Sequence, residues 1–366
     1  SELMNIPKAF SAQNILVRAP NWIGDQVLAY PFFYYLSKAY PKAHITSACG
    51  AWVEDGQFRD LVDEVMVLPR PLSGKWMEKL RAVEEGAGLL RRRSWDLAIS
   101  LPNSLSAAWL LYRSHARRRR GYQMDGRGFL LNDRLRWDPD SSRHRAQAYV
   151  DLLAGEVPPV RDFWGVPPEN DLDPGVPGVL SRFDAEKAWP RAKPMEPPSG
   201  PYWLLAPGAT ADSRRWSEES YAVLARRILE QTGWVGLVVG GPKEAPIASR
   251  LCDDRTLKLK DWTAQGPVTG LSKIFWNAKF TVSNESGLAH VAALCGSPVQ
   301  IICGAADPRR TQPLGPGKVR VMINPVECWP CERNICLNPP ETRLQCLRGI
   351  NPDAVWEEIK RGIRPS

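Results

Sequence analysis

The sequence lacks any apolar run of the roughly 18–20 residues that a membrane-spanning helix requires. Its longest apolar stretches, 234–241 and 299–306, have the length of buried strands. The N-terminal segment contains no apolar core like that of a secretory signal, so we expect a protein of the cytoplasm or of a membrane's inner face. Eight cysteines in 366 residues are too few for a disulfide-rich scaffold.

Two kinds of motif are also missing. No Gly-x-Gly-x-x-Gly loop follows either leading strand predicted below, which argues against a dinucleotide-dependent oxidoreductase.

Ten arginines stand against four aspartates between Arg113 and Arg145, within a chain of net charge +8. This basic patch favours a polyanionic partner or forms a solvated face. No recognisable nucleic-acid module accompanies it, so nucleic-acid binding is kept only as an alternative of a different class.

Strand-like and helix-like segments alternate in two series, separated by a proline-rich stretch at 157–178. The predicted strands are 14–19, 44–48, 64–68 and 96–101, then 202–206, 235–239, 280–283 and 299–303. The predicted helices are 26–40, 76–92 and 104–113, then 218–231, 245–252, 268–278, 287–294 and 352–361. This alternation predicts an α/β protein with two doubly wound, Rossmann-like domains that face a central cleft. Ligands are expected at the carboxyl ends of the strands.

The loop after the first predicted strand ends in Gly24-Asp25, at the start of a helix. Aspartate is a favoured helix N-cap, and this is the simpler interpretation of Asp25. The alternative interpretation is a general base in the cleft.

The second series carries loops suited to phosphate. The loop after the strand at 202–206 contains Thr210 and Arg214, a hydroxyl and a guanidinium that suit phosphate oxygens. Glu244 follows two glycines and could bond ribose hydroxyls. The segment from Glu285 to His290 places Ser286 and Gly287 where a strand gives way to a helix, and free amides there favour an anion. His290 lies one turn inside that helix.

Four cysteines, Cys328, Cys331, Cys336 and Cys346, stand close together near the C-terminus. Their spacing is compatible with a structural zinc site. It matches no common zinc finger closely, and free thiols or disulfides are the alternatives. A catalytic metal is not expected, because four thiolates would close the coordination shell.

Taken together, these loops resemble the ADP-heptose:lipopolysaccharide heptosyltransferases of glycosyltransferase family 9, over nearly the whole chain. ILVRAPNWIGDQV resembles the family's first strand and loop, APGATADSRRW its phosphate loop, and VSNESGLAHVAALCGSPVQIICGAADP its most diagnostic motif. SLPNSLSAA and FLLNDRLRW resemble the heptosyltransferase II branch. The chain departs from the family pattern twice: Arg214 stands where lysine is usual, and Glu285 where aspartate is usual.

The resemblance implies the GT-B architecture. We expect an acceptor-binding domain at 1–172 and a nucleotide-sugar domain at 173–351, with a C-terminal helix (352–366) packed back on the first domain. It implies inverting, metal-independent transfer of heptose from ADP-heptose to the lipopolysaccharide inner core, at the inner face of the inner membrane. A heptosyltransferase I that acts on Kdo-lipid A, or a family member that uses another nucleotide sugar, is the nearest alternative.

The resemblance also implies roles for individual residues. Asp25 is expected to be the general base, and Arg214 to offset charge on the departing diphosphate. Donor binding is expected from Gly24, Thr210, Glu244, Gly266, Glu285, Ser286, Gly287 and His290. The lipid A–Kdo–heptose acceptor is expected to meet Asn103, Ser104, Arg117, Arg118, Arg119, Arg120, Arg127 and Arg134. No cofactor is expected in catalysis, and the sequence does not reveal the oligomeric state.

Overall fold

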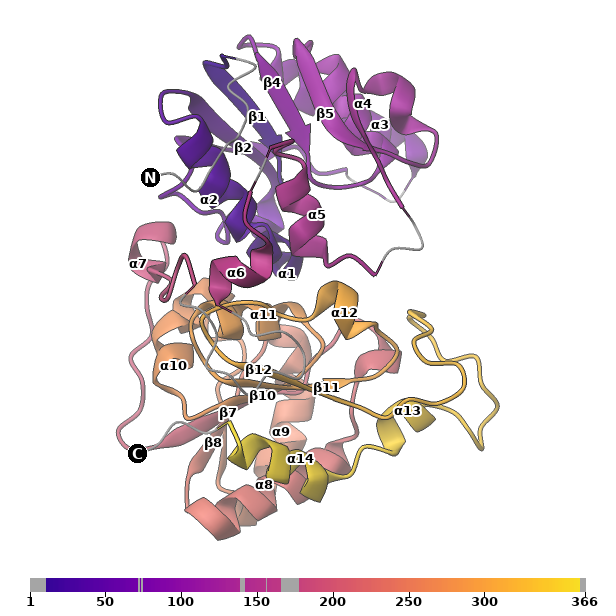
Figure 1. Cartoon of the computed structure of the whole chain (residues 1–366). Helices are drawn as coiled ribbons and strands as arrows, with labels where there is room; N and C mark the ends of the chain where they lie inside the picture. The colour runs from indigo at the N-terminus through magenta and orange to yellow at the C-terminus, as the bar shows by residue number, and fades with distance from the viewer. Residues whose placement is uncertain are drawn as a thin grey trace. The chain divides into compact units, whose positions relative to one another are not determined.

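The computed structural model describes residues 11–71, 73, 75–138, 142–155, 157–165 and 178–362. The chain divides into two compact units (Figure 1). Unit 1 comprises Ser1–Phe163 and Glu186–Arg191, and unit 2 comprises Trp164–Ala185 and Ala192–Ser366. The change of domain expected at 172/173 falls at residues outside the described ranges.

Unit 1 is built on a six-stranded parallel sheet with the order β3-β2-β1-β4-β5-β6. Its strands are β1 (Asn14–Arg18), β2 (His44–Gly50), β3 (Glu64–Leu68), β4 (Leu97–Ser100), β5 (Arg118–Gln123) and β6 (Asp133–Arg136). Its helices are α1 (Ile23–Leu28), α2 (Tyr30–Ala39), α3 (Trp76–Leu90), α4 (Leu105–Arg113), α5 (Arg145–Asp151), α6 (Val160–Trp164) and α7 (Ala185–Ala188). The order reverses between β1 and β4, where a doubly wound sheet opens a crevice for ligands.

The helices of unit 1 cover both faces of this sheet, as a parallel sheet requires. On one face α3 and α4 contact each other, and Ala87 and Leu111 pack over Leu16 and Ala98 of the strands. The other pair, α2 and α5, also contact each other (Figure 1). Because both faces are covered, the middle residues of the central strands β1 and β4 are apolar and buried.

Unit 2 repeats the plan with the order β12-β11-β10-β7-β8-β9, again all parallel. Its strands are β7 (Tyr202–Ala206), β8 (Val235–Val238), β9 (Leu259–Asp261), β10 (Thr281–Asn284), β11 (Val299–Cys303) and β12 (Val319–Ile323). Its helices are α8 (Glu218–Thr232), α9 (Ala245–Asp253), α10 (Ser272–Asn277), α11 (Gly287–Leu294), α12 (Pro308–Thr311), α13 (Gln345–Arg348) and α14 (Pro352–Lys360). The crevice position lies between β7 and β10.

Two details differ from the sequence-based expectations. The helix expected at 26–40 is two helices, and Pro31 lies in the first turn of α2, where a missing N–H costs no helical hydrogen bond. The last helix, α14, packs against α8, and its Val355 and Trp356 are buried in the core of unit 2. Its apolar side is therefore used within unit 2 rather than on the N-terminal unit, where we had expected this helix to pack.

Candidate active site

Asp25 lies in the first turn of α1, in the loop-helix segment that follows β1. The N-cap position is taken by Trp22, which makes no side-chain cap hydrogen bond. Asp25 is the third helical residue, and its carboxylate instead forms an ion pair with Arg145, with 2.7 Å between Oδ1 and Nη1. The N-cap interpretation of Asp25 is therefore wrong. Gly24 is buried in the same turn, in unit 1.

Arg145 is the first residue of α5, 120 residues after Asp25 in the chain. It holds the carboxylate at the carboxyl edge of β1. Tyr149, one turn later, is buried beside them: burial raises its pKa well above the usual value, and the Asp25 carboxylate raises it further. Sequence reasoning did not single out Arg145. Only the fold brings the start of α5 to this edge, so no local motif could have revealed the pair.

The loop after β4 places Asn103 and Ser104 across the crevice position from the Asp25 loop, on the neighbouring strand. Ser104 is the N-cap of α4 and accepts a hydrogen bond from Ala107 N. Arg127 fixes this loop through hydrogen bonds. It donates to the Pro102 carbonyl at 2.8 Å and to Asn103 Oδ1 at 2.7 Å.

Arg127 cannot be an acceptor-binding residue in this structure, because its side chain has 0% exposure. It also donates to the Tyr122 carbonyl at 2.8 Å, and burial lowers its pKa to about 10. The expectation for Arg127 is therefore corrected: it positions the Asn103 loop and does not face solvent. Since Asn103 Oδ1 is engaged by Arg127, its amide N–H groups are left as the donors that the loop can offer.

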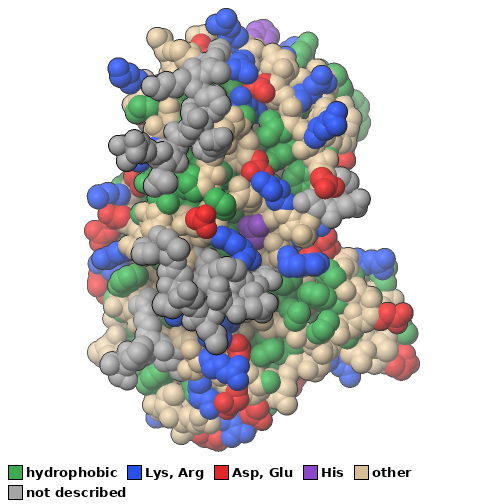
Figure 2. Space-filling model, in the orientation of Figure 1, with side chains coloured by type: hydrophobic (Ala, Val, Ile, Leu, Met, Phe, Trp, Pro, Cys, Tyr) green, Lys and Arg blue, Asp and Glu red, His purple; other side chains and the backbone are tan. Residues whose placement is uncertain are grey.

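Three of the four consecutive arginines, Arg118 to Arg120, belong to β5, and their side chains bond groups inside unit 1. Arg118 and Arg120 lie on one face of β5 and pair with Asp133 of β6 at 3.2 and 2.7 Å. Arg119 points to the other face, where it donates to the Leu130 carbonyl and stacks over Tyr112. Figure 2 shows a similar mixing of basic and acidic side chains on the face that it draws.

The position of this run also argues against acceptor binding. Arg118 is paired with Leu97, the first residue of β4, so Arg117 and Arg118 lie at the amino edge of the sheet. Asp25 lies at the opposite, carboxyl edge, and ligands of doubly wound sheets bind there. Arg117, Arg118, Arg119 and Arg120 are therefore left out of the acceptor site proposed below. Arg134 is exposed in the middle of β6, opposite Gly121.

In unit 2 the predicted donor residues gather at the carboxyl edge of the sheet. The loop after β7 carries Thr210, which is exposed, and Arg214, whose side chain is 27% exposed. The loops after β8 and β9 carry Glu244 and Gly266, and Gly266 has a positive φ of 142° that glycine tolerates. The loop after β10 leads into α11 with Ser286 and Gly287. Loops from β7 and β10 thus flank the crevice position of this unit.

Asn284, the last residue of β10, ties these two loops together. Its Nδ2 donates to the Pro207 carbonyl at 2.6 Å, and its Oδ1 accepts from Trp216 N at 3.0 Å and from the Tyr221 hydroxyl at 2.7 Å. The side chain is fully buried. A single amide therefore fixes both ends of the loop that carries Arg214. We did not predict this role, although an amide at a strand end next to Glu285 is a recognisable signal.

Glu285 faces Arg214. Its Oε2 lies 3.5 Å from Arg214 Nη1, and its Oε1 accepts a hydrogen bond of 2.9 Å from Thr311 in α12. The Glu285 side chain is only 8% exposed. The two departures from the family pattern therefore contact each other, and the carboxylate aligns the guanidinium rather than capping α11.

Glu244 packs against the glycine-bearing loop. Its Oε2 accepts a hydrogen bond of 2.8 Å from Gly241 N, while a Cβ on Gly208 would lie 2.6 Å from its Oε1. A side chain at position 208 would therefore displace Glu244 from this position. This close approach turns Oε1 toward the loop after β7, where a ribose hydroxyl could meet it.

The N-terminus of α11 is suited to an anion. Ser286 is its N-cap but makes no side-chain cap hydrogen bond to the helix, and its hydroxyl lies 3.2 Å from that of Ser283. The first amides of this eight-residue helix therefore point to the carboxyl edge without a capping side chain. His290 is buried in the first turn, on the same helix.

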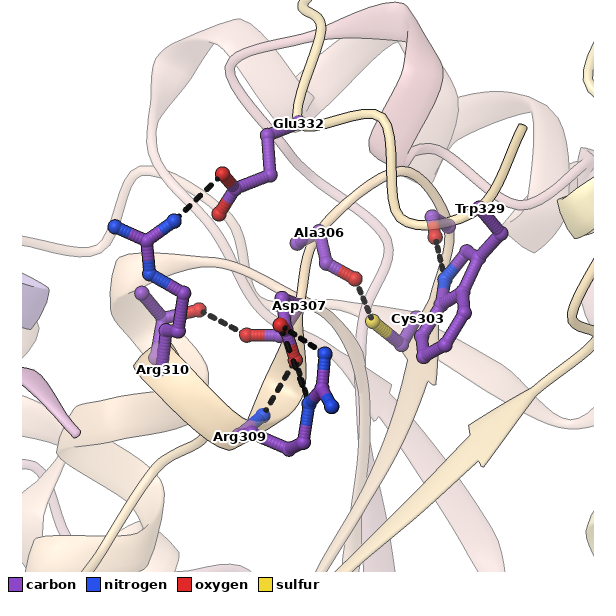
Figure 3. A network of polar contacts seen from close by, with 9 residues as sticks. Cys303, Ala306, Asp307, Arg309, Arg310, Trp329 and Glu332 are labelled. Carbon is purple, nitrogen blue, oxygen red and sulfur yellow. Dashed lines mark hydrogen bonds and ion pairs between the residues drawn. The ribbon is translucent and has the colours of Figure 1, made fainter. Parts of the chain in front are cut away.

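The segment after β11 joins this edge to the cysteine-rich tail, as Figure 3 shows. Asp307 caps α12 and forms a bidentate pair with Arg309, and Arg310 pairs with Glu332 at 2.9 Å. Trp329 donates to the Gly304 carbonyl at 2.9 Å.

The tail also contacts the Arg214 loop directly. Ser213 Oγ donates to the Arg333 carbonyl at 2.5 Å, and Ala305 N donates to the Ser213 carbonyl at 3.2 Å. The tail thus supports the residue that precedes Arg214.

The cysteines do not form a metal site in the described part of the chain, which includes all four. Burial raises the pKa of Cys346, and the neighbouring thiols of Cys331, Cys328 and Cys336 raise it further. Yet no group of three or more cysteine, histidine, aspartate or glutamate side chains in the described ranges could hold a metal ion. Two thiols accept hydrogen bonds instead, Cys336 from Leu344 N and Cys328 from Asn338. The residues do not fit the zinc site that the spacing suggested.

Among the described helices, none is both long and apolar enough to cross a membrane.

Comparison with known proteins agrees with this geometry. Lipooligosaccharide heptosyltransferase 2 of Haemophilus ducreyi is 27% identical over 358 residues, covering 95% of this chain and 98% of the relative. Lipopolysaccharide heptosyltransferase 1 of Pseudomonas aeruginosa is 28% identical over 175 residues, 44% of this chain and 48% of the relative. The solved structure of Escherichia coli ADP-heptose lipopolysaccharide heptosyltransferase II superposes with a TM-score of 0.69 at 22% identity, covering 95% and 98% of the two chains.

The superposition confirms the predicted fold class, two Rossmann-like domains of the GT-B kind. The model of glycosyltransferase family 9 (heptosyltransferase) matches residues 87–341, well over half of the sequence. The chain therefore belongs to glycosyltransferase family 9, the heptosyltransferase family, and is a glycosyltransferase.

Proposed function

We propose that this glycosyltransferase moves L-glycero-D-manno-heptose from ADP-heptose to the first heptose of the lipopolysaccharide inner core, as a heptosyltransferase II. The extent of the matches carries this choice. The sequence alignment with the heptosyltransferase 2 of Haemophilus ducreyi covers 95% of this chain. The alignment with the heptosyltransferase 1 of Pseudomonas aeruginosa covers 44% of it. The heptosyltransferase I reaction on Kdo-lipid A is the second candidate, and another nucleotide sugar the third.

The proposed chemistry begins at Asp25. Its Oδ1 is held by Arg145, and we assign to Oδ2 the proton of the acceptor hydroxyl. As it loses this proton, the acceptor oxygen attacks the anomeric carbon of the heptose. The bond from that carbon to the diphosphate breaks at the same time, which inverts the configuration. ADP leaves with the negative charge. Asn103 and Ser104, across the crevice position from Asp25, are the proposed acceptor contacts.

Arg214 is the proposed partner of the departing diphosphate, because a guanidinium offsets charge that grows in the transition state. Glu285 pairs with Arg214, and Asn284 fixes both ends of the loop that carries Arg214. Thr210 and the amides at the start of α11 are proposed to bind phosphate oxygens, with His290 beside them. Glu244 is proposed to meet the ribose and Gly266 the adenine. No metal is part of this proposal, since Arg214 and the α11 N-terminus supply the positive charge.

A nucleic-acid-binding function is disfavoured by the arginine run. Arg118 and Arg120 pair with Asp133, and Arg119 bonds carbonyl groups within unit 1. The positive charge of these side chains is thus largely used inside the protein. We also propose that the enzyme works at the inner face of the inner membrane, where its lipid acceptor is made.

The experiment is ADP release from ADP-heptose with two acceptors, Kdo-lipid A without heptose and the mono-heptosylated form. Release only with the heptosylated acceptor supports the proposal. Release with the bare acceptor moves the assignment to heptosyltransferase I. The absence of release with both contradicts heptose transfer and directs the search to other nucleotide sugars.

A further inference from the structure

The start of α3 leaves apolar side chains uncovered. Trp76, Met77 and Leu80 are 71%, 64% and 43% exposed. Trp76 and Leu80 lie on the same side of the helix as Ala87, which packs further along in the core of unit 1, and Met77 lies about 80° to one side of Ala87. The apolar side chains in the first two turns of α3 are therefore exposed, whereas Ala87 and Leu90 further along the helix are buried.

Basic side chains border this apolar face on both sides. At about 100° per residue, Trp76, Leu80 and Met77 span an arc of about 100°. Lys79 lies about 60° before Trp76 and Arg81 about 40° beyond Met77, whereas Glu78 falls on the opposite side. Lys75, Lys79 and Arg81 are exposed. An apolar arc with flanking cations is the pattern of a helix that lies in the surface of an anionic bilayer.

Helix α3 begins at the same edge of the sheet as the candidate active site. The helix follows β3, so its first turn lies at the carboxyl edge of the sheet, the edge that also carries the Asp25 loop. β3 is two strands from β1, which corresponds to about 10 Å across the sheet.

Side-chain contacts link the loop after β3 to the loop before α1. Arg70, exposed in the loop after β3, lies over the ring of Trp52 at 5.9 Å. Trp52 is itself 53% exposed, and its indole donates to the Asn21 carbonyl in the loop before α1. Exposed basic and aromatic side chains thus lead from the loop after β3 to the loop that precedes Asp25.

We propose that the first two turns of α3 (75–81, the α3 docking face) bind an anionic phospholipid bilayer, with Trp76, Met77 and Leu80 inserted among the lipids. Lys75, Lys79 and Arg81 contact the phosphate headgroups. Trp76 suits the bilayer surface because indole has an apolar body and a polar N–H. This inference deepens the proposed function and rests on it in one respect, since docking brings the Asp25 edge to a lipid-borne acceptor.

The test is sedimentation of the full chain with vesicles of phosphatidylcholine alone or with phosphatidylglycerol. We expect binding to the anionic vesicles that weakens with salt. The variant W76S/M77S/L80S should partition at least about tenfold more weakly, and K75E/K79E similarly. The matched control is I335S/L337S, which removes two apolar residues of unit 2 that are 62% and 69% exposed, and it should bind as wild type.

Turnover separates this proposal from the proposed function. W76S/M77S/L80S should keep the wild-type rate on a detergent-soluble acceptor and lose most of it on the same acceptor in vesicles. Vesicle binding by a wild-type protein that does not use ADP-heptose would support docking and contradict the heptosyltransferase assignment. Equal binding of wild type and W76S/M77S/L80S would overturn docking. So would conversion of a dimer to a monomer in this variant with unchanged vesicle binding, because the face would then join two copies of the chain.

Discussion

Arg214 and Glu285, the two residues that depart from the family pattern, form an ion pair with 3.5 Å between Nη1 and Oε2. Arginine reaches differently from lysine, and glutamate is one methylene longer than aspartate. The two changes therefore belong together: the longer carboxylate reaches the guanidinium while it also accepts a hydrogen bond from Thr311. Neither departure can be interpreted from the sequence without the other.

This pairing predicts strong coupling in a double-mutant cycle. R214K and E285D should each lower kcat/KM about tenfold or more, because each disturbs the group that faces the diphosphate. R214K/E285D, which restores the usual family pair, should lose less than the sum, with a coupling of about 1 kcal/mol or more. Steady-state kinetics with ADP-heptose measures it. Strict additivity of the two losses would show that the pair does not act as a unit.

A second prediction concerns Arg127. R127M should destabilise the protein by about 1–3 kcal/mol, because it removes the donor to the buried Tyr122 carbonyl. It also removes one of the two donors to the Pro102 carbonyl, which keeps its hydrogen bond from Ser100. It should also raise the acceptor KM through the Asn103 loop. The exposed Arg134 gives the matched control, R134M, which should leave the melting temperature almost unchanged. Thermal unfolding compares them, and equal stability of both variants would contradict the positioning role.

The stability of the folded protein at acidic pH depends partly on Asp307. Its hydrogen bonds from Arg309 lower its pKa, so the carboxylate stabilises the folded state above its unfolded pKa of about 3.9. That contribution is lost as the pH falls through the lower, folded-state pKa. D307N should therefore be less stable than wild type at pH 6, and the difference should shrink below about pH 4. Melting temperatures from pH 3 to 7 provide the test, and a difference that is constant over this range would argue against the account.

Chelation is expected to leave the reaction rate unchanged, because Arg214 and the N-terminus of α11 supply the positive charge that the diphosphate requires. The check is ADP release with and without EDTA, with elemental analysis of the same preparation. A rate that falls with EDTA and returns with a divalent cation would contradict the proposed donor site. Stoichiometric zinc in the chelator-free protein would instead show that the cysteine tail rearranges to bind metal.

Much of the fold could be predicted from the sequence because apolar strands such as 202–206 and 299–303 have a clear local pattern. The site loops could be predicted for the same reason, since they follow those strands directly. Strand β5 could not, because its residues RRRGYQ include only one residue type that is common in strands, Tyr122. Arg120, for example, pairs with Asp133 on the neighbouring strand β6 and donates to the carbonyl of Leu152, 32 residues away. The charge pattern therefore suggested a binding patch where the structure has a strand.

The same limit applies to the partners of the candidate site residues. Asp25 stands in a recognisable loop, but Arg145 reaches it only because α5 returns to the carboxyl edge. Asn284 bonds groups 77 and 68 residues away. Such contacts are set by the tertiary fold, and no spacing along the chain encodes them.

One paired measurement on Asp25 determines whether its carboxylate is the general base. The turnover of D25N is measured on the mono-heptosylated acceptor, while calorimetry measures its binding of ADP-heptose. Because the base acts on the acceptor, we predict a rate lower by about 10²–10⁴-fold with donor affinity close to that of wild type. A D25N enzyme that turns over at the wild-type rate would contradict the account.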